Sequence, residues 1–213
     1  MGPLSARSAD TRHRLLEAAG EVFADLGFRN ATIQEICRRA DANIAAVNYH
    51  FSDKEQLYRA VIRHAEMEGE SPRPRELPPG SSAEERLYVF VEWFLLHLLV
   101  DGRPAWHGRL VAREMIEPTA MLDELVEGHM RENQVRLDGI VRELLGTDAS
   151  DDLVRDCAFS ILGQCLFYHH CEPVIVRLYP GFAVGTDGVP RLAAYITRFS
   201  LAGLREVASR PRR

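Results

Sequence analysis

The 213-residue chain contains a single lysine, Lys54, although it has 26 basic residues in all. Its formal net charge is −5, and residues 1–58 contain seven basic and eight acidic side chains. Neither the chain nor its N-terminal part therefore has the positive charge that attracts nucleic acid in bulk. If the protein binds a polyanion, a few basic side chains must be positioned at the binding site itself, because the net charge does not supply the attraction.

Signals for secretion, membrane insertion and disulfide formation are also missing. The longest apolar run, residues 89–100, is broken by Glu92 and His97 and is too short to span a bilayer. Residues 1–20 lack the apolar core of a signal peptide. Four cysteines without short paired spacings do not form a disulfide framework. We expect a cytoplasmic protein with no membrane segment.

The sequence contains none of the common catalytic or cofactor motifs. It lacks G-x-S-x-G, G-x-G-x-x-G, a Walker loop and H-E-x-x-H. We therefore predict that the protein is not an enzyme and has no cofactor.

The apolar periodicity predicts an all-α fold of about nine helices, with no competing strand pattern. The expected helices cover residues 9–26, 32–40, 44–50, 54–68, 82–100, 104–116, 120–145, 152–171 and 187–207, and residues 172–185 are expected to be irregular. The proline-rich segment 71–81 predicts a linker. It separates a small head (1–53) and its connecting helix (54–70) from a larger body (82–213).

Residues 32–58 hold closely spaced helix-start signals. Thr32 with Glu35 and Ser52 with Glu55 match the S/T-x-x-E capping box. Between them a polar turn at 41–43 interrupts the helical pattern. The helix expected at 32–40 should bury the residues spaced i, i+3, i+4 and i+7, namely Ile33, Ile36, Cys37 and Ala40.

The helix at 44–50 has few core residues. Asn43 is a good N-cap, and only Val47 and Phe51 are clear core positions. The opposite face carries small or hydrogen-bonding residues: Ala45, Ala46, Asn48, Tyr49 and His50. A short helix with a polar outer face suits the DNA major groove, which favours a helix-turn-helix over a purely structural helix pair.

The end of this helix and the residues after it are similar to a known protein family. Asn48-Tyr49-His50-Phe51, followed by Lys54-Glu55-x-Leu57, resembles the TetR family of transcriptional regulators, and residues 40–51 are most similar to its CecR branch. One departure is Asp41, where the family usually has glycine, but Asp tolerates the left-handed backbone that such a turn needs. Weaker similarity to the CecR branch extends over 113–119, 163–168 and 199–204.

The resemblance implies DNA binding by residues 1–53 and effector binding and dimerisation by residues 82–213. It implies a palindromic double-stranded DNA operator, a homodimer formed by the last two long helices, and a repressor released by a small hydrophobic or drug-like ligand. Lys54 corresponds to a phosphate-contacting lysine of the family. The expected DNA-binding residues are Thr32, Asn43, Ala45, Ala46, Asn48, Tyr49, His50 and Lys54.

Polar groups on apolar helices are the candidates for an effector pocket, because such sites combine apolar walls with a few orienting groups. The candidates are Trp93, His97, Trp106, Arg113, Gln164 and Tyr168. Each has an ordinary core or surface position as its alternative. Cys165 and His169, spaced i, i+4, suggest a metal- or thiol-redox-responsive regulator as an alternative function, but one local pair does not predict a metal site.

Overall fold

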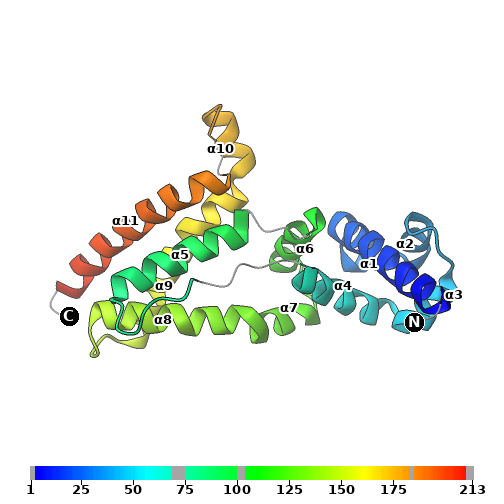
Figure 1. The fold of residues 1–213 in the computed structure, drawn as a ribbon, viewed down its shortest axis with the longest axis horizontal. Coiled ribbons are helices and arrows are strands. Elements are labelled where there is room, and N and C mark those ends of the chain that lie inside the picture. The colour runs from blue at the N-terminus through cyan, green and yellow to red at the C-terminus, as the bar shows by residue number, and fades with distance from the viewer. Residues whose placement is uncertain (1–2, 69–74, 100–103, 183–184, 210–213) are drawn as a thin grey trace. The chain divides into compact units, whose positions relative to one another are not determined.

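The computed structural model describes residues 3–68, 75–99, 104–182 and 185–209. In these residues every regular element is a helix: eleven α-helices, one π-helical turn and one 3₁₀ turn (Figure 1). The predicted all-α fold is confirmed. The chain forms two compact units, an N-terminal unit (Met1–Glu70 with Gly102–Glu127) and a C-terminal unit (Ser71–Asp101 with Gly128–Arg213).

The N-terminal unit is built around its first helix. Its helices are α1 (Pro3–Asn30), α2 (Ile33–Arg39), α3 (Ile44–Phe51), α4 (Lys54–Glu68), α6 (Ala105–Ile116) and α7 (Ala120–Leu125). Helix α1 packs against α2, α3, α4 and α6, and its buried face includes Leu16 and Phe23. At Gly27, directly after the end predicted for this helix at residue 26, the backbone leaves the helical region with φ 76° before the chain continues to Asn30.

The contact between α1 and α6 depends on a glycine. A Cβ atom on Gly20 would lie 2.3 Å from the indole of Trp106, so only glycine admits this ring. Trp106 Nε1 donates to Glu17 Oε2 at 3.1 Å. Residues 104–119, which the sequence places in the body, therefore pack with the N-terminal unit.

A buried carboxylate joins α4 to the α6–α7 turn. Tyr58 Oη donates to Glu114 Oε1 at 2.5 Å, and Thr119 donates its backbone N–H to Glu114 Oε2 at 3.0 Å. Burial, followed by the hydrogen bond to Glu114, raises the pKa of Tyr58. Because Glu114 is itself buried, these donors supply the hydrogen bonds that water would otherwise provide.

The C-terminal unit has a core of four long helices. Its helices are α5 (Ala83–Leu99), α8 (Arg131–Leu145), α9 (Asp151–His170), α10 (Glu172–Leu178) and α11 (Val189–Ser209), with the 3₁₀ turn at Thr186–Gly188. Helices α5, α8, α9 and α11 pack against one another around Leu87, Leu137 and Ile161. Helix α5 begins with a capping box, because Ser82 Oγ accepts from Glu85 N while Glu85 Oε2 accepts from Ser82 N.

Two helix predictions in the second half of the chain were wrong. The single helix expected at 120–145 is divided by the π-helical turn Val126–Met130, where Gly128 leaves the helical region with ψ −127°. The segment expected to be irregular contains α10, whose first turn includes Pro173.

The predicted linker and connecting helix are only partly covered. Residues 75–81 contain no helix, while residues 69–74 lie outside the described part of the chain. None of the described helices has the length and apolarity needed to cross a membrane.

Candidate nucleic-acid interface

Helix α2 starts as the sequence predicts. Thr32 Oγ1 accepts from Glu35 N at 3.2 Å, and Ile36, Cys37 and Ala40 are buried, with Ile33 half-buried against the core. Hydrogen bonds from Arg38 and Arg39 lower the pKa of Glu35 to about 2. The two arginines of α2 therefore already have a counter-charge.

The turn between α2 and α3 accommodates Asp41 in the left-handed region, with φ 48°. Arg14 of α1 holds this turn by donating Nη1 to the carbonyl oxygens of Ala40 at 2.5 Å and Asp41 at 3.1 Å. The expectation that aspartate can replace the usual glycine here is confirmed.

Helix α3 is fixed at its start and along its inner face. Asn43 Oδ1 accepts from Ala46 N at 2.9 Å, while Val47 and Phe51 are buried. The outer face exposes Ala45, Asn48 and Tyr49, the last with 80% of its side chain accessible, whereas Ala46 and His50 are half-buried. Ile44, which is 53% exposed on the same helix, was missed, although its i, i+4 spacing to Asn48 was visible in the sequence.

The predicted Ser52–Glu55 capping box is wrong. Asp53 caps α4 instead, since its Oδ1 accepts from Gln56 N at 2.8 Å. Ser52, with φ 68°, ends α3 by donating its backbone N–H to the carbonyl of Asn48.

Lys54, at the start of α4, lies against the end of α1. Its Nζ is 3.4 Å from the carbonyl oxygen of Arg29 and 4.7 Å from the centre of the Phe28 ring. Burial lowers the pKa of Lys54.

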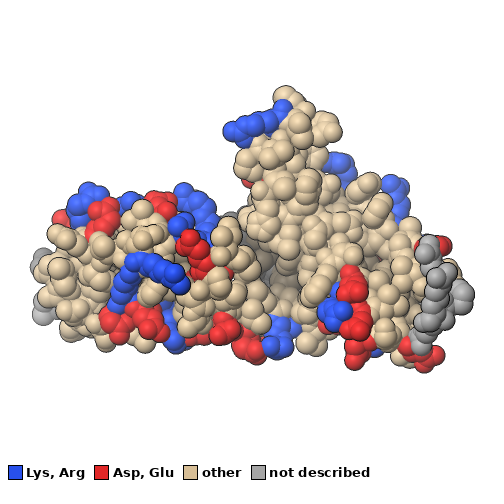
Figure 2. All heavy atoms as spheres, turned by 180° about the vertical axis from the view of Figure 1, so that it is seen from behind, with Lys and Arg blue, Asp and Glu red and all other residues tan. Residues whose placement is uncertain are grey.

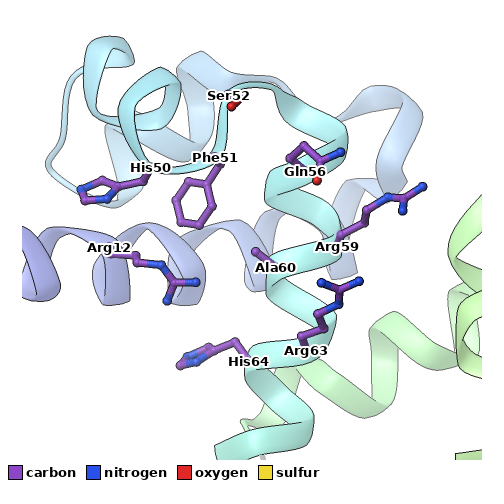
Figure 3. A pocket seen from close by; sticks show the side chains of 9 residues that line it. All are labelled: Arg12, His50, Phe51, Ser52, Gln56, Arg59, Ala60, Arg63 and His64. Carbon is purple, nitrogen blue, oxygen red and sulfur yellow. The ribbon is translucent and has the colours of Figure 1, made fainter. Parts of the chain in front are cut away.

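A hollow of about 730 Å³ lies between α1, α3 and α4 and has several cations in its walls. Figure 3 shows Arg12 on α1, His50 on α3, and Arg59 and Arg63 on α4, and all four line the hollow. Glu124 partly balances them, with its oxygens 2.5 Å from Arg59 Nη1 and 3.4 Å from Arg63 Nη2. Figure 2 shows basic and acidic side chains interspersed over the visible face of this unit, as the near-neutral count indicates.

The predicted effector residues fall into three groups. Trp93 and His97 stack on α5 with ring centres 5.7 Å apart. Gln164 and Tyr168 of α9 line a hollow of about 480 Å³ together with Tyr195 and Ile196 of α11.

The third group lies in the N-terminal unit. Trp106 packs on Gly20, and Arg113 Nη1 lies 3.5 Å from the carbonyl oxygen of Asp25. The structure therefore brings Trp93 to His97 and Gln164 to Tyr168. Trp106 and Arg113 contact different parts of α1, and the six residues are divided between the two units.

The Cys165–His169 pair acquires no third metal-binding side chain among the described residues. Burial raises the pKa of Cys165 to about 12, so its thiol is protonated at neutral pH.

Helix α3 is capped at its start, buries one face and exposes the other, and follows α2 through a tight turn. This arrangement defines a helix-turn-helix DNA-binding protein. Residues 15–61 match the family described as bacterial regulatory proteins, tetR family. Residues 83–204 match the C-terminal domain of the HTH-type transcriptional dual regulator CecR. The chain belongs to the TetR family of DNA-binding transcriptional regulators, with a CecR-type C-terminal domain. This is a family without enzymatic activity.

Individual members of the family share about a quarter of their residues with this chain. The CecR regulator of Shigella flexneri is 26% identical over 175 residues, which is 78% of each chain. The transcriptional repressor NicS of Pseudomonas putida is 25% identical over 94% of this chain and 95% of its own. A TetR-like regulator from Rhodococcus sp. RHA1 has the same fold, with a TM-score of 0.58 and 24% identity over 91% of this chain and 96% of its own.

Proposed function

We propose that this protein is a homodimeric repressor that binds a palindromic operator and leaves it when a small, largely apolar ligand binds its C-terminal unit. The exposed face of α3, which is held rigid by its cap and by Val47 and Phe51, is the observation that carries the DNA-binding part.

On this face, Asn48 and Tyr49 are the side chains suited to read bases. An asparagine amide forms paired hydrogen bonds with adenine in the major groove, and an aromatic ring can contact a thymine methyl group. Thr32 at the start of α2, His50 in the last turn of α3 and Lys54 at the start of α4 are assigned to the phosphate backbone. Asn43, Ala45 and Ala46 lie at the start of α3, where small side chains permit close approach.

Exposed aromatic residues on α9 and α11 support dimerisation. These two helices pack together and carry Phe159, Phe167, Tyr195 and Phe199, each about half exposed or more. A patch of this kind on a soluble protein marks an interaction surface, and self-association by a two-fold axis uses the same patch twice. We therefore assign the four-helix contact between protomers to α9 and α11.

A buried, unpartnered donor supports ligand binding near Trp93. The Trp93 side chain is 8% exposed, and its Nε1 has no hydrogen-bond partner among the described residues. A buried donor left in this state costs about 1–3 kcal/mol. A ligand with a carbonyl or other acceptor oxygen would remove that penalty.

A second buried polar atom without a partner among the described residues, Thr197 Oγ1 of α11, lies about as far along the α5–α11 pair as Trp93 does. The contact of Arg205 with Glu84 shows that the end of α11 meets the start of α5. Nine residues further along α5 is Trp93, and eight residues back along α11 is Thr197, whose Oγ1 is also buried without a partner. The region between α5 and α11 thus suits an apolar ligand with one or two polar groups.

The DNA-binding part is tested by selecting operator fragments from random DNA with the full-length protein. We expect an inverted repeat whose half-sites are about one helical turn or more apart. Asn48→Ala should select a less defined sequence with the same symmetry. Enrichment of a single asymmetric site, or of no sequence, would contradict the proposal.

The ligand-binding part is tested with tryptophan fluorescence, because the chain has only Trp93 and Trp106. Apolar compounds that release operator DNA should quench wild-type emission, and this quenching should disappear in Trp93→Phe while Trp106 still emits. Trp93→Phe should bind operator normally but need more ligand for release. Compounds that bind without changing operator affinity would refute the inducer mechanism and leave the DNA-binding part intact.

A further inference from the structure

The N-terminal unit contains a cluster of two imidazoles and a carboxylate away from the exposed face of α3. His13 and Glu17 are spaced i, i+4 on α1, and His64 comes from α4, which packs against α1. The three potential ligand atoms all lie within 4.8 Å of one another. We propose that this His13–Glu17–His64 cluster binds a divalent transition-metal ion of the zinc class.

The distances are close to those that metal coordination requires. His64 Nε2 is 3.0 Å from Glu17 Oε1, and the His13 and His64 rings meet edge to face with centres 5.3 Å apart. In a tetrahedral zinc site, nitrogen and oxygen ligands are about 3.3 Å apart, because each bond is about 2.0–2.1 Å. Small side-chain rotations therefore bring His13 into coordination without moving either helix.

The carboxylate is already oriented from its other oxygen. Trp106 Nε1 donates to Glu17 Oε2, which leaves Oε1 directed at His64. Hydrogen bonds of this kind to the outer atom of a metal ligand fix its orientation in known metal sites. The indole can reach Glu17 only because residue 20 is glycine, so α1, α4 and α6 all contribute to the cluster.

The surroundings permit entry of a cation. His13 is exposed, whereas the His64 side chain is only 12% exposed, so an ion would approach from the side of His13. Figure 3 shows His64 leaving α4 on the side of Arg12. Arg59 and Arg63, the other cations on α4 nearby, are paired with Glu124.

The donor set indicates which ion is bound. Two imidazoles and one carboxylate suit zinc, cobalt, nickel or ferrous iron better than the hard ions magnesium and calcium, which prefer oxygen ligands. Three protein ligands leave a coordination position for water or an exogenous anion. Binding would replace the hydrogen bond between His64 and Glu17 and thereby link α1 to α4 directly.

The test uses the full-length protein, freed of metal with a chelator that is then removed. Addition of Co²⁺ should produce the visible absorption of a four- or five-coordinate ion at one equivalent per chain, and Zn²⁺ should abolish it. His13→Gln and His64→Gln should each weaken binding by about 100-fold or more, since even outer-sphere partners contribute about 10–100-fold. Trp106→Phe should weaken it by about 10–100-fold.

His170→Gln on α9 is the matched control and should bind Co²⁺ as the wild type does. His13 is exposed, so His13→Gln tests the site without risk to the fold, and circular dichroism checks that each variant is folded. No Co²⁺ spectrum in the wild type, or an unchanged spectrum in folded His13→Gln, would show that the cluster is only a hydrogen-bonded contact between α1 and α4.

Discussion

At the scale of single residues, Lys54 combines a structural contact with a predicted DNA contact. Its ammonium group lies over the Phe28 ring and near the last turn of α1, where burial lowers its pKa. A phosphate placed beside this partly desolvated group would favour its charged form. The chain's only lysine is therefore suited to bind the DNA backbone without reading its sequence.

We predict that Lys54→Met weakens binding to all DNA sequences alike and lowers the salt dependence by about one unit. Methionine retains an apolar chain over Phe28, so the free energy of unfolding should change by no more than about 0.5 kcal/mol. Fluorescence anisotropy at several salt concentrations measures both affinity and slope. Asn48→Ala is the control and should alter sequence preference at an unchanged slope; the opposite pattern in the two variants would reverse their roles.

Cys165 provides a test of the thiol-redox alternative. Because burial raises its pKa to about 12, the reactive thiolate is scarce at neutral pH in the folded protein. We predict that iodoacetamide modifies Cys165 only after unfolding, when the pKa returns to about 8.5. Mass spectrometry of peptides, with denatured protein as the control, measures the labelling. Rapid modification of Cys165 in the folded state would revive the redox mechanism.

Residue-level predictions succeeded where the signal was local. Val47, Phe51 and the caps at Thr32 and Asn43 follow from spacing within one helical turn. The prediction of the α4 cap was wrong because Ser52-x-x-Glu55 and Asp53-x-x-Gln56 are both acceptable helix-start sequences. The choice depends on the left-handed backbone of Ser52, which the sequence pattern does not reveal.

At the scale of elements, the position of α6 was the least predictable feature. Its periodicity predicts a helix at 104–116 but not its neighbour, and the hydrogen bond that joins it to α1 links residues 89 positions apart. Gly20 was the sequence signal for this contact. A glycine inside a long helix lowers helix stability, so its presence indicates that another element packs closely against it.

We predict that Gly20→Ala destabilises the protein, because its Cβ would lie 2.3 Å from the Trp106 ring and displace α6. The expected loss is about 1–3 kcal/mol, as for other overpacked cores, and exceeds the gain in helix propensity. Gly139→Ala in α8 is the control, since nothing lies within 4 Å of its new Cβ, and it should stabilise by about 0.5–1 kcal/mol. Urea denaturation compares them; equal effects would mean that α6 yields freely.

At the scale of the whole molecule, the chain passes between its two units after residues 70, 101 and 127. The ligand that we propose for the C-terminal unit would thus have three covalent routes to the N-terminal unit, at the end of α4, the start of α6 and the end of α7. The third route contains the π-helical turn with Gly128, a local irregularity of a kind often found at functional sites. A ligand can shift DNA affinity along these routes only by its differential affinity for two arrangements, typically about 1–3 kcal/mol.

The predicted dimer gives the last test at this scale. Phe199 is 61% exposed on α11, so Phe199→Glu should leave the folded protomer intact while placing like charges opposite each other across a two-fold interface. We expect sedimentation of this variant at micromolar concentration to show monomers, and operator affinity to fall at least tenfold because each protomer holds only one half-site. Val135→Glu, at an exposed position of α8 in the same unit, should remain dimeric. If Phe199→Glu stays dimeric and binds operator normally, the two-fold contact lies elsewhere than on α9 and α11.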